Sequence, residues 1–405
     1  TPYTHLTDGF DDQDNFFEVM PGEFLSGPLA KAWQTLNDNE ALRAVADKLV
    51  SLGNTAHEYL AGGEGADSKT PAVINQTMEF IDDSNQFFTF INLMDAHLPY
   101  HPPKEFRDEF APGVDSTEVC QNSKEYNSGA RDIDDDEWED IRGLYDAEIA
   151  HIDSQLTRLF DHLKETGRWD DTMVVVCADH GELHGEHDLY GHEFCLYDPL
   201  VNVPLMVKHP KLEEDRREDQ VELIDLYHTV LDSVGVEGGT PASAGDDVVA
   251  LDQTRSLVSG SYRQFKRAND PGQRGDGKYA FVEYSRPVVE LKQLEEKAKD
   301  AGITIPEQSR YYSRMRAARR REAKYVRIDR IEDEAYRIDE DPAETTNLAD
   351  ADDELIQETE AMLSEFESAI GEAWDTADDA DVSDDAVQDM DEEAQERLRD
   401  LGYME

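Results

Sequence analysis

A short apolar run that ends in a dense group of polar side chains is the feature that most constrains this chain. Residues 173–178 read Met-Val-Val-Val-Cys-Ala, a mostly β-branched pattern that predicts a fully buried strand. Asp179 and His180 follow directly, and residues 180–192 contain four histidines. Ligands of open α/β sheets bind beyond the carboxyl ends of the strands, so we expect a site to begin at Asp179.

The residue types at this position favour a metal or anion site. A buried Asp–His pair at Asp179 and His180 needs a compensating charge, and a divalent cation supplies one. The alternative interpretation is a turn with a solvated carboxylate, which a chain this acidic could carry. His184 and His187 fit a role as loop residues bonded to the backbone as well as a role as ligands.

The charge balance of the chain is strongly negative. It has 38 basic and 93 acidic residues, a formal net charge of −55, which argues against nucleic acid or anionic membranes as partners. Self-repulsion of this size would destabilise a compact state at low salt. We therefore expect a chain of haloarchaeal type, adapted to high ionic strength. The alternative is an acidic mesophilic protein with disordered tails.

A folding titration separates these two interpretations. The screening length falls from about 30 Å at 0.01 M salt to about 3 Å at 1 M, so we expect the thermal midpoint of unfolding to rise steadily with potassium chloride into the molar range. A midpoint that stops rising near physiological salt would favour the mesophilic interpretation.

Cysteine usage and hydropathy suggest a compartment. Cys120, Cys177 and Cys195 form neither a metal-binding spacing nor an even disulfide set, which favours a reducing, cytoplasmic location. The chain has no apolar run of 18 residues and no leader pattern, so we expect no membrane anchor. Because it starts with Thr1 rather than Met, its first residue need not be the first residue of the gene product.

The pattern along the chain predicts two domains. Helical periodicity predicts helices at residues 28–61, 71–81, 136–167 and 219–235. Apolar runs predict strands at residues 87–94, 173–178 and 204–208. Strands and helices in this order favour a doubly wound sheet in an α/β core over residues 1–260.

The pattern of predicted elements changes after about residue 260. Candidate strands occupy residues 279–284, 322–329 and 334–338, with a charged helical segment at 288–322 and an acidic, partly helical tail at 351–405. These elements predict a smaller α+β domain over residues 261–405.

Several blocks of the chain, taken in order, resemble one family. Residues 87–103, which include Met-Asp-Ala-His-Leu-Pro-Tyr, resemble the sulfatase segment in which a strand delivers a histidine to the anionic ester. Residues 178–192 are similar to the Asp-His-Gly-Glu metal motif of that family, and residues 203–208 to its following Val-Pro-Leu strand. Residues 341–348 resemble its Asp-Pro-x-Glu-x-x-Asn-Leu signature. The resemblance covers about residues 70–350.

The resemblance implies both a fold and a site. The implied fold is the α/β fold of the alkaline phosphatase superfamily, a mixed, largely parallel sheet between helices with a smaller C-terminal antiparallel sheet. By resemblance, Asp179 and His180 are metal ligands, while His97 and His192 contact the anionic group or protonate the leaving alkoxide. Calcium is the first expectation for the cation. Magnesium, manganese and zinc are also compatible with these ligands, and an imidazole ligand favours manganese and zinc more than an all-oxygen shell would. The implied substrate is a small-molecule or glycan ester of sulfate or phosphate.

The sequence departs from the family pattern in two ways. Sulfatases carry their nucleophile in a Cys-x-Pro-x-Arg motif, and none of the three cysteines stands in one. We therefore expect the chain as given to lack the N-terminal nucleophile segment, together with an acidic pair of metal ligands, and to be inactive by itself. The second departure is His192, which stands where many sulfatases have Lys and where phosphate-ester members also have His.

Two other functions remain open on the sequence alone. One is a phosphodiesterase, phosphatase or phosphoglycerol transferase of the same superfamily with a Ser or Thr nucleophile. The other is a noncatalytic member that binds an anion or a partner.

Overall fold

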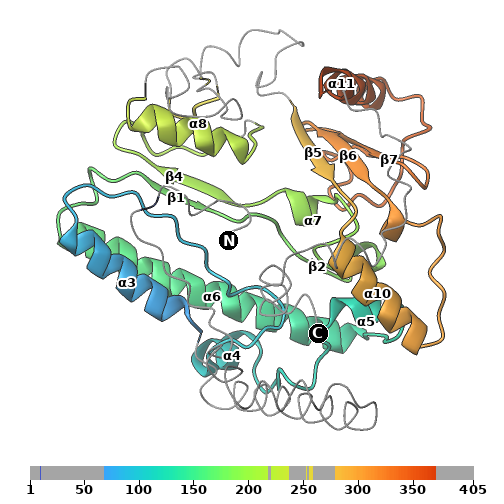
Figure 1. Ribbon diagram of the computed structural model, residues 1–405, viewed down its shortest axis with the longest axis horizontal. Helices are drawn as coiled ribbons and strands as arrows, with labels where there is room; N and C mark the ends of the chain where they lie inside the picture. Colours follow the sequence, from blue (N-terminus) through green and yellow to red (C-terminus); the bar gives the residue numbers. More distant parts are fainter. Residues whose placement is uncertain are drawn as a thin grey trace, which may run out of the picture. The chain divides into compact units, whose positions relative to one another are not determined.

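The computed structural model describes residues 10, 68–217, 220–236, 252, 255–258 and 279–370 (Figure 1). The chain forms two compact units. The described residues of the first are 10, 68–126 and 131–167, and those of the second are 127–130 and all described residues from 168 onward. The helix predicted at 28–61 and the end of the acidic tail lie outside the described residues. The predicted domain boundary at residue 260 stays a prediction, because residues 259–278 lie outside them as well.

Three of the described helices of the first unit pack together. The helices α3 (Thr70–Asp83) and α4 (Lys104–Phe110) pack against the long helix α6 (Asp135–Glu165). Asp134 caps α6 by accepting a hydrogen bond from Glu137 N, and acidic residues in its first turn complement the helix dipole. The helix gives way to Gly167, whose positive φ of 72° suits glycine. The helices predicted at 71–81 and 136–167 are confirmed.

The strand predicted at residues 87–94 is wrong. The segment has no regular secondary structure and pairs with no strand among the described residues. Phe88 and Phe90 are 57% and 72% exposed, and the ring of Phe88 contacts Phe10 with the ring centroids 5.7 Å apart. An apolar run indicates that a segment favours burial, but a strand also needs a neighbour for its N–H and C=O groups.

The second unit begins with the strand that leads to the predicted site. The strands β1 (Val174–Cys177) and β4 (Leu205–Lys208) pair antiparallel, and the short strands β2 (Leu183–His184) and β3 (Tyr190–Gly191) form a second antiparallel pair between them in sequence. The described strands include no parallel pair, so the doubly wound order of the predicted sheet stays a prediction. The connection between β1 and β4 holds the β2–β3 pair, a one-turn 3₁₀ helix η2 (Glu186–Asp188) and the four-residue helix α7 (Asp198–Val201).

The C-terminal part of the second unit is an antiparallel sheet of β5 (Ala280–Tyr284), β6 (Met315–Arg319), β7 (Lys324–Ile328) and β8 (Glu334–Tyr336), in this order. The helix α11 (Glu354–Ile370) packs on β6 and β7. Apolar side chains from the sheet and α11 form the core between them: Tyr279, Ala318, Ala323, Tyr325, Ala335, Ile356 and Leu363. The predicted strands and the α+β character of this region are confirmed.

The charged helix predicted at 288–322 is too long. Helix α10 (Val288–Asp300) ends at Asp300, and a 3₁₀ turn η3 (Arg310–Tyr312) and strand β6 follow. Arg316 of β6 is only 7% exposed, and its guanidinium pairs with Glu283 of β5. Arg316 is buried because its charge is paired. A charged residue at a buried position interrupts the apolar pattern of a strand, so the sequence did not predict β6.

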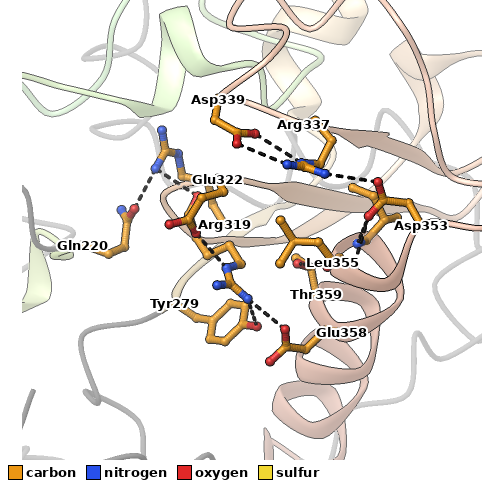
Figure 2. Close-up of polar contacts among 12 residues, drawn as sticks. Gln220, Tyr279, Arg319, Glu322, Arg337, Asp339, Asp353, Leu355, Glu358 and Thr359 are labelled. Atoms are coloured by element: carbon orange, nitrogen blue, oxygen red, sulfur yellow. Dashed lines mark hydrogen bonds and ion pairs between the residues drawn. The ribbon is translucent and has the colours of Figure 1, made fainter. Parts of the chain in front are cut away.

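Arg337 ties the end of the sheet to the start of α11. Figure 2 shows its guanidinium between Asp339 and Asp353, at 3.1 Å and 3.3 Å. Asp353 also accepts hydrogen bonds from the backbone N–H groups of Leu355 and Ile356 in the first turn of α11.

Two further described helices are α5 (Ser123–Asn127) and α8 (Ile224–Ser233), and α8 confirms the helix predicted at 219–235. Asp225 in its first turn pairs with Arg255 at 2.6 Å. Among the described helices, none combines the length and the hydropathy that crossing a bilayer requires.

Candidate active site

The loop after β1 brings three of the four predicted site residues together. The imidazole rings of His180 and His192 stack with their centroids 4.4 Å apart and their planes 26° apart. His180 Nε2 lies 3.9 Å from Asp179 Oδ2. The side chain of Asp179 is 83% exposed and that of His180 is 38% exposed. The expectation that this pair is buried is therefore wrong, and both side chains are open to a ligand from solvent.

The hydrogen bonding of His180 leaves one ring nitrogen ready for a cation. Its Nδ1 lies 2.9 Å from the carbonyl oxygen of Gly181, and because a carbonyl only accepts, Nδ1 carries the hydrogen. In the neutral ring Nε2 then holds a free lone pair on the side of Asp179. A backbone carbonyl that fixes the tautomer in this way is typical of metal-bound histidines.

The spacing of the two side chains also fits a shared cation. Ligands about 2.0–2.4 Å from one divalent ion lie at most about 4.5 Å apart, and the observed separation of 3.9 Å is within that limit. The described residues contain no group of three or more His, Cys, Asp or Glu side chains arranged to hold a metal. The pair would therefore supply two ligands of a larger shell.

His192 lies between two buried acids to which the sequence pattern assigned no role. His192 Nδ1 is 3.6 Å from Glu182 Oε1, and Nε2 is 3.9 Å from Glu193 Oε1. The side chains of Glu182 and Glu193 are 3% and 5% exposed. Glu182 Oε1 is buried and accepts no hydrogen bond from the described residues, and His192 Nδ1, at 3.6 Å, is too far away to donate one. The signal in the sequence was present, since both acids stand within two residues of a predicted site residue.

Helix α7 is hydrogen-bonded to the loop that carries Asp179 and His180. The N–H of Gly181 donates to the carbonyl of Leu200 in α7 at 2.8 Å, directly after His180. At the start of α7, the carboxylate of Asp198 accepts hydrogen bonds from Arg319 and Lys324. Burial raises the pKa of Asp198, but the hydrogen bond from Arg319 and the charge of Lys324 outweigh it and leave the pKa below its usual range.

Lys324 connects α7 to the C-terminal signature. Its side chain is fully buried, and its ammonium pairs with Asp198 at 3.0 Å and with Glu344. Glu344 in turn accepts a hydrogen bond from the N–H of Asp198 at 2.6 Å. Burial raises the pKa of Glu344, and Lys324 opposes that rise. The buried cluster Asp198–Lys324–Glu344 thus fixes the helix that carries the site loop.

His97 lies in the first unit. Its Nδ1 donates to the carbonyl of Leu98 at 2.6 Å, and its Nε2 is buried. The segment 95–101 around it is tightly turned, with a φ of 66° at Ala96 and a cis peptide bond between Leu98 and Pro99.

The two other histidines of the loop have packing roles. His184 is 6% exposed in β2. His187 stacks on Tyr197 with the ring centroids 3.5 Å apart, and burial, assisted by Arg310, lowers its pKa and favours the neutral ring. Of the two interpretations for these residues, the structure favours the one as loop residues.

None of the three cysteines is set up as a nucleophile. Burial raises the pKa of Cys195 to about 12, and burial also raises the pKa of Cys120 and Cys177. The thiolate is the reactive form, so these thiols are poorly reactive at neutral pH.

Comparisons with known proteins identify the family of the chain. The sulfatase family model matches residues 7–236, which is more than half of the chain. The chain belongs to the sulfatase family.

The relatives come from the wider superfamily. The chain is 36% identical over 119 residues to a multifunctional alkaline phosphatase superfamily protein of Trinickia caryophylli, covering 28% of this chain and 22% of that protein. It is 26% identical over 206 residues to an arylsulfatase of Clostridium perfringens, covering 45% of this chain and 42% of that one. The chain thus spans less than half the length of these curated relatives.

A solved structure shows the same fold. The phosphonate monoester hydrolase of Agrobacterium radiobacter superposes with a TM-score of 0.51 at 20% identity, covering 75% of this chain and 60% of that one. The predicted alkaline-phosphatase-like α/β fold is therefore confirmed. The described strand pairs are all antiparallel, so its largely parallel part stays a prediction.

Proposed function

We propose that this chain is part of a metal-dependent hydrolase of sulfate esters. The observation that carries the proposal is the arrangement at the carboxyl end of β1, where the free nitrogen of His180 lies beside the Asp179 carboxylate and the ring of His192 stacks on His180. Family membership supports the reaction class, and the arylsulfatase among the relatives supports sulfate as the anion.

Each site residue has a role that follows from its chemistry. Asp179 and His180 would hold a divalent cation, with calcium proposed first and magnesium, manganese or zinc as alternatives. When bound, such a cation supplies Lewis-acid stabilisation of the developing negative charge. His192 would contact the ester oxygens and exchange protons with the neighbouring acids, and His97 would present Nε2, because its Nδ1 donates to Leu98.

The polypeptide as given is expected to be a poor catalyst. No Cys-x-Pro-x-Arg motif occurs in its 405 residues, and one Asp–His pair alone does not replace an activated nucleophile. We expect negligible turnover of aryl sulfate or phosphate esters by this polypeptide. Robust metal-dependent turnover by these 405 residues would contradict the assignment.

The coding sequence upstream of the Thr1 codon tests the choice of sulfur or phosphorus. A Cys-x-Pro-x-Arg motif there is expected, and the complete gene product should then lose roughly 100-fold or more of its arylsulfatase kcat/KM in His180→Ala. A lone Ser or Thr nucleophile would support the phosphate-ester alternative.

That alternative has specific support. Histidine rather than lysine stands at position 192, and the superposed enzyme is a phosphonate monoester hydrolase. The third possibility is a noncatalytic member that binds an anion or a partner. It would be favoured if the complete gene product took up no metal in a calorimetric titration.

We further propose a cytoplasmic, high-salt setting and a small-molecule or glycan ester as the substrate.

A further inference from the structure

The segment that carries His97 is held at both ends by one buried side chain of helix α6. Glu148 is only 5% exposed, and its Oε1 accepts the backbone N–H of His101 at 2.8 Å. Its carboxyl group also forms a side-chain hydrogen bond with Asp95, the residue at the other end of the segment. Glu148 therefore spans the turn that contains His97.

A hydrogen bond between two carboxyl groups requires a proton. Asp95 already accepts a hydrogen bond from the Thr70 hydroxyl, whereas Glu148 Oε2 is buried and meets no N–H or O–H donor of the described residues. Two ionised carboxylates would only repel each other here. The proton is best placed on Glu148, because burial first and the charge of Asp95 second raise the pKa of Glu148 to about 8.

Among the described groups near this pair, His151 does not supply a positive charge in place of the proton. His151, one turn further along α6, is 4% exposed, and burial lowers its pKa, so it is neutral near pH 7. Its ring packs edge-on against Phe106. Glu105 of α4 adds another negative charge near His151. His101 is held to the Ser116 hydroxyl by its Nδ1 at 3.0 Å.

We propose that Glu148, in its protonated form, is the positioning residue for His97, joining Asp95 to the N–H of His101 and so fixing the turn between them. This inference rests on the proposed function in giving His97 a role at the ester. The clamp itself is a property of the first unit and is measurable without turnover.

The chain offers a matched pair of variants. In Glu148→Gln the amide oxygen accepts from His101 N–H and the amide nitrogen donates to Asp95, so the clamp persists at every pH. In Glu148→Leu both bonds are lost at similar side-chain volume. The wild type should lose the clamp only when Glu148 ionises.

The experiment measures the segment directly by NMR on the complete 405-residue chain at several pH values between about 6 and 9. Two signals are read: the hydrogen-exchange protection of the His101 amide, and the ring ¹⁵N pattern that reports an Nδ1-protonated His97. We expect wild-type protection to fall as the pH rises through about 8, Glu148→Gln to stay flat, and Glu148→Leu to lose roughly tenfold or more of its protection at neutral pH.

The sign of the stability effect gives a second check. The pKa of Glu148 is raised from 4.5 to about 8 on folding, so between these values the folded state binds the proton that the unfolded state has released. Stability from this group is fully present below pH 4.5 and is lost as the pH rises through about 8. Glu148→Gln should remove this part of the pH dependence.

The outcomes separate the inference from the proposed function. A Glu148→Gln variant that loses His101 protection with pH as the wild type does would overturn the clamp. So would a folded Glu148→Leu variant with wild-type signals from His101 and His97. If Glu148→Leu does not fold, the comparison of wild type with Glu148→Gln still decides whether the clamp exists.

Addition of sodium sulfate tests the proposed function separately. A clamp that behaves as expected, together with His97 ring signals that do not change on addition of sulfate, would count against the proposed function alone.

Discussion

Replacing Lys324 by methionine is expected to destabilise the protein by about 3–5 kcal/mol, because the substitution leaves buried carboxylates without their cation. Lys324 is fully buried and pairs with Asp198 and with Glu344, whose side chain is also fully buried. Arg319 still pairs with Asp198 in the variant, at 2.7 Å, so Glu344 becomes the uncompensated charge. Urea unfolding of wild type and variant at pH 7 measures the difference.

The same variant should show a characteristic pH dependence. Lys324 opposes the rise that burial causes in the pKa of Glu344, so its loss raises that pKa further. Glu344 then takes up a proton as the pH falls, and the destabilisation should be smaller near pH 5 than at pH 7. The double variant Lys324→Met/Glu344→Gln should recover most of the loss, since it no longer buries the unpaired charge.

Lys164→Met is the matched control. Lys164 forms an ion pair with Asp161 at 3.1 Å on the surface, with both side chains more than half exposed. Such pairs contribute about 0–1 kcal/mol. A Lys324→Met variant that loses no more stability than Lys164→Met would contradict the role assigned to the cluster Asp198–Lys324–Glu344.

Gly181→Ala is expected to disturb the candidate site more than any other conservative change nearby. A Cβ at this position would lie 2.0 Å from the carbonyl oxygen of Pro199, and the Gly181 N–H already donates to Leu200 O. Both contacts are with backbone, so the loop at Asp179 and His180 must move away from α7. We expect a loss of about 1–3 kcal/mol in stability together with weakened cation binding.

Gly302→Ala separates this clash from simple backbone strain. Gly302 has a φ of 71° and open space around its Cα, so alanine there costs only about 1 kcal/mol through its backbone conformation. It should leave metal binding unchanged. Equal metal affinity in Gly181→Ala and wild type, measured by calorimetry, would show that α7 does not position the site loop.

Much of the architecture followed from pattern because the relevant signals are local. The β-branched run before Asp179 predicted β1, and the apolar periodicity after Asp134 predicted α6 almost to its ends. Pairing partners are not local. Residues 87–94 were predicted to be a buried strand, but they pair with no strand among the described residues. An apolar run carries no information about which other segment would supply the hydrogen bonds of a strand.

The sequence predicted the residues of the candidate site but not the buried residues that hold the surrounding segments in place. Asp179, His180 and His192 were identified because metal and oxyanion chemistry needs their side chains. Glu148 was not, because one acid inside a long acidic helix looks like a solvated residue until its burial is known. Lys324 was not identified for the same reason. Its charge is compensated by Asp198 and Glu344, and the sequence does not show that these residues lie beside it.

We propose that Asp179 and His180 bind one divalent cation, and electron paramagnetic resonance of Mn²⁺ added to the 405-residue chain measures this binding. We expect bound Mn²⁺ with a nitrogen coupling from an imidazole, lost in His180→Ala and kept in His162→Ala, which removes the histidine of a surface His–Asp pair with Asp82. A chain that binds no Mn²⁺, or a nitrogen coupling that survives in His180→Ala, would contradict it.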